Sequence, residues 1–333
     1  MNPLHLTYLN GPDIGKLKMT DHEILDAVEG GLRAAGSGQT VLEPRVHLVP
    51  DPGFNGHFNV LRGYLATRNV AGVKIVSDFL DNYRHGLPSE MALLNLFHPQ
   101  TGVPVAIIDA TAITEMRTGA MTAVGAKYLA PPNPRVLGHI GARGTAYWNV
   151  RLLDHLFNFD EIRVHSRRPE SRNAFADTLA RDLGKPVVVT DTWQECLEDA
   201  DIMVEASRLP EPAPLFRTRW IKKGGLVVPY GTMSALEMDH TDVMDKIVVD
   251  DRGQMNSGPF GALRPHINAG KVSPETVYAE IGEIVGGSLP GRETGDGTIL
   301  FWHRGLATSD IALGMAMLDK AARLGHGQTL RYA

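Results

Sequence analysis

A glycine-containing turn, GHIGARGTA at residues 138–146, joins a predicted apolar strand to a predicted helix. Glycines in such a turn let the backbone approach a pyrophosphate, and the first amide groups of the helix donate hydrogen bonds to it. The match to the usual G-x-G-x-x-G pattern is incomplete, because Arg143 stands where a second glycine is common. A plain tight turn is the alternative. The residues expected to bind a dinucleotide here are Gly141, Ala142, Arg143, Gly144, Thr145 and Ala146.

The end of the next predicted strand, 162–166, bears on which dinucleotide is bound. An acidic residue there would hold the adenosine ribose hydroxyls, whereas a basic residue would accept a 2'-phosphate. The chain continues Ser166-Arg167-Arg168 with no acid, which favours NADP. The alternative is that both arginines only face solvent. NAD and NADP both stay open, and Ala206 and Ser207 are expected to add cofactor contacts after the predicted strand 201–206.

Two basic residues on predicted strands are candidates for contact with a carboxylate. Arg45 lies on the alternating segment 41–49, and its guanidinium can bind a carboxylate through two hydrogen bonds. Lys74 alternates with Val73 and Ile75, so its ammonium faces away from their apolar side. A lysine flanked by β-branched residues is usually a solvated strand residue.

The N-terminal third needs a scaffold of strands to position these residues. Thr20 to Glu23 has the form of a capping box and is followed by helical spacing of apolar residues up to a stop at Gly36. Turn residues then separate several short segments of strand character. They are 41–49, 58–66, 72–77, 92–97 and 103–109. A small mixed sheet with few helices is the structure that this pattern predicts.

From Thr111 the pattern changes to helices and strands in alternation. A helix at 111–129 ends before a proline-rich stretch at 131–134. Strands are predicted at 136–140, 162–166, 187–189, 201–206, 226–230 and 247–249, with helices at 145–157 and 171–183. Such alternation predicts a doubly wound parallel sheet with helices on both faces. A last helix, 306–323, could return to the first domain. The fold class is therefore α/β, a Rossmann-type sheet plus a smaller mixed α+β domain.

Length and composition limit the classes of function. A chain of 333 residues exceeds one ordinary core, so two domains are expected. A net charge of −5 gives no reason to expect a nucleic acid or an anionic membrane as partner. The single cysteine, Cys196, excludes an internal disulfide and is expected to be a buried thiol. We find no signal peptide and no apolar run near the ~20 residues that span a bilayer, so a cytoplasmic protein is expected.

Two other kinds of site lack a motif in this chain. The 13 histidines do not fall into a recognisable zinc spacing, so no metal is expected. The G-x-S-x-G turn of one class of serine hydrolases is missing as well.

The chain resembles the ornithine cyclodeaminase/mu-crystallin family along nearly its whole length. Four segments carry the resemblance in order around the glycine turn: GVKIVS at 72–77, ITEMRTGA at 113–120, EIGEIVGG at 280–287 with PGR at 290–292, and GLATSD at 305–310. The resemblance implies an enzyme of two domains, usually a homodimer, that binds NAD(P). Residues 1–118 with 305–333 would form the substrate and dimerisation domain, and residues 119–304 would bind the dinucleotide.

The resemblance also implies roles for individual residues. By position, Arg45, Lys74 and Arg117 match the basic residues around the substrate carboxylate in this family, although Arg117 on a helix could form a surface ion pair near Glu115. Asp310 would complement an iminium group or only cap the last helix. Lys74 is the first candidate for a proton donor, and His57 and His303 are further candidates.

Two departures from the family pattern bear on the substrate. Cyclodeaminases carry an aspartate after the strand that corresponds to 226–230, where this chain reads GTMSA at 231–235 with no acid until Glu237. Ornithine cyclisation is therefore in doubt. In place of a small serine before Gly305, the chain has His303 and Arg304, whose donors would suit a second acid group on the substrate.

These observations predict an NAD(P)H-dependent enzyme that reduces a small anionic imino acid to an amino acid. The preferred reaction is iminosuccinate to L-aspartate, with Arg45, Lys74, Arg117 and His303 binding the substrate. An ornithine cyclodeaminase or a cyclic ketimine reductase is the rival enzyme. A binding protein with little turnover, as in mu-crystallins, is the alternative from another class.

Overall fold

The computed structural model describes residues 3–293, 295 and 297–333. It divides into two compact units by internal contacts. Unit 1 consists of Met1–Arg117, Asn256–Gly258 and Gly305–Ala333, and unit 2 of Thr118–Met255 and Pro259–Arg304. The first boundary falls inside one helix, between Arg117 and Thr118. Whether unit 1 has the predicted role in substrate binding and dimerisation stays a prediction.

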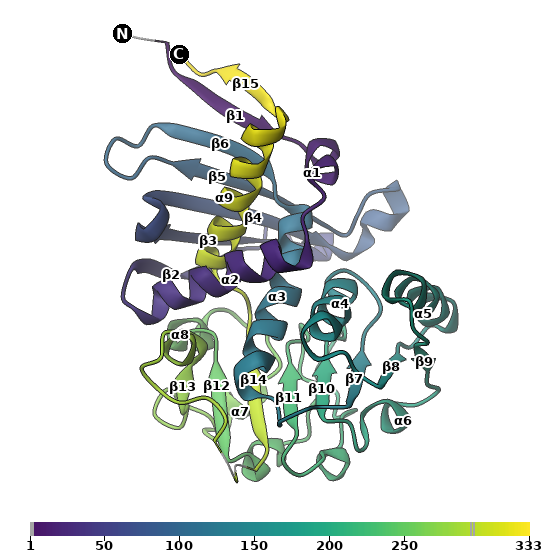
Figure 1. Ribbon diagram of the computed structural model, residues 1–333. Coiled ribbons are helices and arrows are strands. Elements are labelled where there is room, and N and C mark those ends of the chain that lie inside the picture. The colour runs from purple at the N-terminus through teal and green to yellow at the C-terminus, as the bar shows by residue number, and fades with distance from the viewer. Residues whose placement is uncertain (1–2, 294, 296) are drawn as a thin grey trace. The chain divides into compact units, whose positions relative to one another are not determined.

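Unit 1 is a seven-stranded mixed sheet with helices on one face (Figure 1). Its elements are β1 (His5–Leu9), α1 (Gly11–Leu17), α2 (Asp21–Gly36), β2 (Thr40–Leu48), β3 (Gly56–Leu65), β4 (Val70–Phe79), β5 (Glu90–Phe97), β6 (Pro104–Asp109), the start of α3 (Thr111–Leu129), α9 (Ala307–Leu324) and β15 (Gln328–Arg331). The strand order is β15-β1-β6-β5-β4-β3-β2, and only β1 and β6 pair in parallel. The predicted mixed sheet is confirmed.

The core of unit 1 lies between the sheet and the packed helices α2 and α9. Thr20 caps α2 in the predicted capping box with Glu23, and Val28 and Leu32 of α2 are fully buried. On the sheet, Leu94 and Ile108 are likewise fully buried. Burial of these side chains removes apolar surface from water and holds α9 against β3, β4 and β5.

The other face of this sheet carries apolar side chains in the open. Ile75 and Leu93 are cross-strand partners on β4 and β5, and Leu93 is 48% exposed. The same alternation exposes Val46, Leu48, Met91 and Val105. We name these six residues the open face. A solvated face of an antiparallel sheet normally carries polar residues, so the apolar character of the open face is unusual.

Unit 2 is an eight-stranded sheet in which every neighbouring pair is parallel. Its elements after the remainder of α3 are β7 (Val136–Ile140), α4 (Ala146–Phe157), β8 (Glu161–His165), α5 (Pro169–Leu183), β9 (Val188–Val189), α6 (Trp193–Leu197), β10 (Ile202–Glu205), β11 (Leu226–Pro229), β12 (Lys246–Val249), α7 (Arg264–Asn268), β13 (Ala279–Glu280), α8 (Ile281–Val285) and β14 (Ile299–Trp302). The predicted α/β fold class is confirmed.

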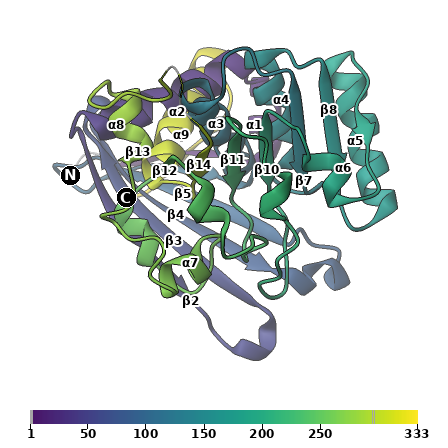
Figure 2. The same cartoon turned by 90° about the horizontal axis from the view of Figure 1, so that it is seen from below.

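The order of the parallel strands reverses in the middle of the sheet. From β7 the chain runs outward through β8 to β9, then returns to the other side of β7 with β10 and β11. Figure 2 shows β11, β10, β7 and β8 side by side in this order. A doubly wound sheet binds its ligand outside the carboxyl ends of the strands where this reversal occurs. The strand order therefore predicts that unit 2 binds its ligand at the ends of β7 and β10.

The strands that the sequence analysis missed are short or lie near the chain ends. β14 is a four-residue apolar run between β11 and β12 in the sheet, too short to show a period. β1 and β15 pair with each other in antiparallel register, so their stability depends on a partner more than 300 residues away.

The structure settles two smaller expectations. Cys196 is buried in α6, and burial raises the pKa of its thiol to about 12, so the predicted unreactive thiol is confirmed. Among the helices of the described residues, none is long and apolar enough to cross a bilayer.

A substitution of Gly119 on α3 would test how closely α3 packs against α4 in unit 2. A Cβ at Gly119 would lie 2.5 Å from the backbone carbonyl carbon of Trp148. We expect Gly119→Ala to destabilise the protein by roughly 1–3 kcal/mol, because backbone cannot move aside as a side-chain end can. The control is Gly30→Ala in α2, where a Cβ meets nothing within 4 Å and alanine favours the helix. Thermal denaturation should show opposite signs, and a Gly119→Ala protein as stable as wild type would contradict the packing described.

Candidate active site

Three of the predicted site residues form one buried charge cluster in unit 1. The Lys74 ammonium donates to Asp310 Oδ1 at 2.6 Å, and Arg117 Nε donates to the same oxygen at 2.8 Å. The side chains of Lys74 and Asp310 have no exposed surface, and that of Arg117 is 6% exposed. The three residues come from β4, α9 and α3, which are distant in the sequence.

Lys74 is buried because β4 presents it to the core face of the sheet. Gly72, Lys74 and Val76 alternate inward, whereas Ile75 between them is on the open face. Lys74 lies between Leu61 of β3 and Leu94 of β5 in the sheet register. Lys74 is therefore not the solvated strand lysine that was the alternative to a site role. The alternation was identified correctly, but both faces of β4 are apolar, so the pattern alone did not tell which face is buried.

Arg117 is not part of a surface ion pair and Asp310 is not a helix cap, which were the alternatives to a site role. Arg117 is not on the surface near Glu115, since it is buried and paired with Asp310. Asp310 does not cap the last helix, because the N-cap residue of α9 is Leu306 and no side chain makes a capping bond there. Asp310 instead anchors the two cations.

The surroundings of the cluster destabilise the charged form of Lys74 and stabilise the charged form of Asp310. Burial lowers the pKa of Lys74 to about 8 against the attraction of Asp310, with Arg117 adding repulsion. Burial would raise the pKa of Asp310, but the charges of Arg117 and Lys74 outweigh it and hold that pKa below its usual range. Asp310 is thus an anion near neutral pH, while Lys74 releases its proton near pH 8.

Gly305 brings Arg45 next to this cluster. Arg45 Nη2 donates to the carbonyl of Gly305 at 2.6 Å. Gly305 has a φ of +87°, and a Cβ there would overlap the guanidinium of Arg117. The backbone of Gly305 thus lies against Arg117 and Arg45, and only glycine fits between them.

The turn at the end of β7 has the geometry of a phosphate-binding loop. Gly141 has a φ of +112°, and a Cβ there would lie 2.7 Å from the carbonyl oxygen of Ala206. Gly144 has a φ of +55°, and α4 begins directly after Thr145. Arg143 is exposed and Ala142 half-buried on the same loop. The loop therefore meets the end of β10 so closely that backbone fills the space a side chain would take.

The predicted residues after β8 lie at the surface. Ser166 is half-buried, and its hydroxyl donates to the carbonyl of Arg168 at 3.4 Å. Arg167 and Arg168 are exposed. This placement is compatible with a 2'-phosphate and equally with solvated arginines, so the preference for NADP stays a prediction.

His303 directly follows β14 in unit 2, and its neighbours there were not predicted from the sequence. Its Nε2 shares a hydrogen bond with Thr122 Oγ1 at 2.8 Å, and its ring stacks on Tyr230 with centroids 4.9 Å apart. Tyr230 in turn shares a hydrogen bond with Thr145 Oγ1 at 2.8 Å and accepts one from Asn149. Tyr230 directly follows β11. This position at the carboxyl end of a strand could have identified it as a candidate site residue from the sequence.

The remaining predicted residues have local partners. Arg304 donates through its backbone N–H to Asp250 at 2.7 Å and through Nη1 to the carbonyl of Gln254 at 2.8 Å. His57 lies on β3 opposite Asp78, with Nε2 3.2 Å from Asn59 Nδ2. It is four residues along the strand from Leu61, the register partner of Lys74, so it is not part of the Lys74 cluster.

A carboxyl group that the sequence analysis missed stands beside the loop 231–235. Glu205, the last residue of β10, is fully buried, and a Cβ at Gly231 would lie 2.5 Å from its Oε2. The loop itself contains no acid, as predicted, but its surroundings do. The signal was again a polar residue at the carboxyl end of a buried strand.

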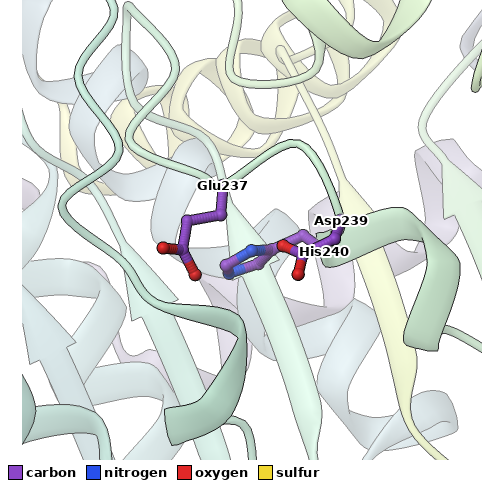
Figure 3. Close-up of side chains that lie close together, drawn as sticks. All are labelled: Glu237, Asp239 and His240. Carbon is purple, nitrogen blue, oxygen red and sulfur yellow. The ribbon is translucent and has the colours of Figure 1, made fainter.

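Within the described part of the chain, one group of side chains has spacing suited to a metal ion. Ligand atoms of Glu237, Asp239 and His240 lie within 4.8 Å of one another (Figure 3). Glu237 already accepts hydrogen bonds from Arg217 Nη1 and from the backbone of Thr218, both at 2.7 Å. His240 Nδ1 is 2.9 Å from the Thr218 hydroxyl. These bonds explain the group as a stabilised turn, and a cation would have to displace Arg217.

Comparison with known proteins gives a consistent picture. Residues 8–324 match the profile of the Ornithine cyclodeaminase/mu-crystallin family. The Δ1-pyrroline-2-carboxylate reductase of Thermococcus litoralis, solved with NADH and L-proline, superposes with a TM-score of 0.90 at 27% identity over 97% of this chain and 99% of its own. An archaeal alanine dehydrogenase dimer with bound NAD has a TM-score of 0.90 at 28% identity over 99% and 100%. The iminosuccinate reductase of Paracoccus denitrificans with NAD⁺ has a TM-score of 0.88 at 25% identity over 98% and 99%.

Gly141 offers a direct test of the dinucleotide loop. We expect Gly141→Ala to weaken NADH binding by roughly 10-fold or more, because both the positive φ and the contact with Ala206 oppose a side chain. Gly184→Ala is the matched control, since Gly184 has a φ of +68° but a Cβ there meets nothing within 4 Å. Calorimetric titration with NADH measures both. Equal affinities for wild type and Gly141→Ala would remove the loop from the cofactor site.

Proposed function

The chain belongs to the ornithine cyclodeaminase/mu-crystallin family, and from this premise we propose that it reduces iminosuccinate to L-aspartate. It is an NAD(P)-dependent oxidoreductase that acts on imine or amine groups, like its structural neighbours. The turn at Gly141 fits a dinucleotide. Its backbone has no room for a Cβ, and it lies at the start of a helix, where a pyrophosphate binds. When bound, the reduced nicotinamide supplies a hydride to the imine carbon.

The positive charge of the unit 1 cluster carries the substrate proposal. Lys74 and Arg117 are two buried cations that share one oxygen of a single carboxylate, Asp310, and Arg45 lies next to them through Gly305. Glu90 attracts the Lys74 ammonium more weakly than Asp310 does. Uncompensated buried charge is costly, so a ligand with two carboxylates stabilises this site better than a ligand with one.

The side chains of this cluster would have different roles in the reduction of an imino acid. Arg45 and Arg117 would bind carboxylate oxygens, because guanidinium groups offer paired donors. Lys74 would hold a proton at Nζ for the imine nitrogen, since its pKa of about 8 makes that proton transferable. Asp310 would keep Lys74 and Arg117 in place and favour an iminium cation nearby.

A cyclic ketimine with one carboxylate is the second candidate substrate. The neighbour from Thermococcus litoralis was solved with L-proline, a monocarboxylate, and superposes as well as any structure compared above. The two candidates differ in charge, so they can be separated by substrate preference.

The open face of unit 1 supports a homodimer. Its apolar side chains on β2, β4, β5 and β6 are exposed although they lie in a regular sheet. A second copy of the chain would remove this surface from water. The neighbouring archaeal alanine dehydrogenase is a dimer.

Substrate charge gives the main test of the proposed reaction. Oxaloacetate with ammonia should be reduced with a kcat/KM about 10-fold or more above that of pyruvate with ammonia, a difference of about 1.4 kcal/mol. Lys74→Ala should cost about 2 kcal/mol or more in transition-state stabilisation, whereas Lys16→Ala at the surface should change nothing. NAD(P)H oxidation with both cofactors measures these values. Equal rates with pyruvate and oxaloacetate would favour the monocarboxylate candidate.

The pH dependence of the reaction tests the role of Lys74. If the ammonium form is required, kcat/KM should fall as pH rises through about 8, where Lys74 loses its proton. Lys74→Arg keeps a positive charge at every such pH. Its residual activity should therefore lack this decline. A decline of the same shape in both proteins would assign the titration to the substrate or to another group.

A further inference from the structure

Glu205 occupies the place in unit 2 where the strand order reverses. It is the last residue of β10, which lies between β7 and β11 in the sheet. β7 carries the glycine turn, and the chain leaves β7 on one side and returns with β10 on the other. A dinucleotide binds across this reversal with its adenosine half on the β7–α4–β8 side. Its nicotinamide half then extends over the ends of β10 and β11.

The carboxyl group of Glu205 is held by one oxygen only. Oε1 accepts hydrogen bonds from the backbone N–H of Ser207 at 2.7 Å and from the Ser207 hydroxyl. Oε2 has no hydrogen-bond partner among the described residues, although Glu205 has no exposed surface. The bonds from Ser207, two residues on, orient the carboxyl group forward, beyond the end of the strand.

Two loops at the carboxyl edge of the sheet enclose this group. The backbone oxygen of Glu205 accepts from the N–H groups of Tyr230 at 2.8 Å and Gly231 at 3.1 Å. A Cβ at Gly231 would lie 2.5 Å from Oε2 and 3.0 Å from the carbonyl oxygen of Ser207. The absence of a side chain at Gly231 therefore leaves room for the carboxyl group between loops 206–208 and 230–232.

An unpartnered buried oxygen is costly and is not needed to support Ser207. A single acceptor oxygen would satisfy the Ser207 N–H, so Oε2 is surplus to the local structure. Burial raises the pKa of Glu205 to about 7, although the hydrogen bonds from Ser207 oppose the rise. Near neutral pH the carboxyl group is therefore often protonated, and it can then donate a hydrogen bond as well as accept one.

We propose that Glu205 is a cofactor-binding residue whose Oε2 hydrogen-bonds the nicotinamide half of the dinucleotide. The groups that this half offers are ribose hydroxyls and a carboxamide, which are uncharged and pair well with a neutral carboxyl group. A protonated Glu205 also adds no negative charge beside the pyrophosphate. The inference rests on the proposed NAD(P)-dependent function and deepens it by assigning a residue to one half of the cofactor.

The experiment compares three ligands on wild type, Glu205→Ala and Glu205→Gln by calorimetry at pH 6.0. The ligands are NADH, ADP-ribose, which lacks only the nicotinamide ring, and ADP, which lacks the whole nicotinamide half. We expect Glu205→Ala to weaken NADH by roughly 2- to 10-fold, the effect of one hydrogen bond, and to leave ADP unchanged. A matching loss for ADP-ribose assigns the bond to the ribose, and no loss for ADP-ribose assigns it to the carboxamide. Glu211→Gln on an exposed loop position is the control.

A second arm uses pH. The affinity of wild type for NADH should fall as pH rises from 6.0 to 8.5, because Glu205 loses its donor proton and gains charge near the phosphates. Glu205→Gln keeps a donor at every pH and should bind NADH with the same affinity throughout. Other titratable or charged side chains near the end of β10 stay in this variant, so a decline that they cause would persist. They are His139, Arg143, Arg208, Tyr230 and His303.

Three results would overturn the proposal, and they differ from failure of the proposed function. Equal losses of NADH and ADP in Glu205→Ala would make Glu205 a support of the loop only. Unchanged NADH affinity in Glu205→Ala would leave its carboxyl group for the substrate or for no ligand. The same pH decline in wild type and Glu205→Gln would assign the titration elsewhere. If wild type binds neither NADH nor ADP, the dinucleotide function itself is wrong.

Discussion

The bond between Asp310 and the two cations Lys74 and Arg117 is the constraint on which unit 1 depends. An ammonium without exposed surface is unstable in an apolar core unless a carboxylate accompanies it. Asp310 supplies that carboxylate from α9, so α9 is fixed against β4 by charge as well as by apolar packing. The same bond fixes Arg117 at the boundary of the two units, because Arg117 is the last residue of unit 1 on α3.

The buried charges of this cluster lower the stability of the core and make Lys74 more reactive. A leucine at position 74 would pack between Leu61 and Leu94 without any charge to compensate. The chain instead keeps a lysine whose pKa is lowered to about 8, along with two arginines held by Asp310 and Gly305. Perturbed pKa values of this kind concentrate at functional sites. Glu205 in unit 2 shows the same principle with the opposite sign of charge, since burial makes its neutral form common near pH 7.

The sequence predicted the fold class and most elements because their signals are local. The capping box at Thr20, the alternation in β4 and the strand–helix alternation after Thr111 all lie within a few residues of the structure they specify. The family resemblance added the candidate residues Lys74, Arg117 and Asp310, but not their contact. Whether Lys74 faces the core or solvent depends on α9, more than 230 residues later, so no local pattern contained it.

Glu205 and Tyr230 were missed for a related reason. Each is a polar residue directly after or at the end of a buried strand, and such positions converge only once the strand order is known. β10 and β11 are neighbours of each other, and β7 adds the glycine turn on the other side of β10. The strand order thus brings these three strand ends together at one edge of the sheet.

The discontinuity of unit 1 has a consequence for synthesis on the ribosome. Its first 117 residues emerge early, but Asp310 and β15 are translated only after the whole of unit 2. At ~5–20 residues per second, about 200 residues of delay amount to roughly 10–40 seconds. Throughout that interval Lys74 has no Asp310 to accompany it into the core and β1 has no β15 at its edge. Unit 2 is nearly continuous in sequence and can fold during this time, so the nascent N-terminal segment is the part of the chain that needs protection from aggregation.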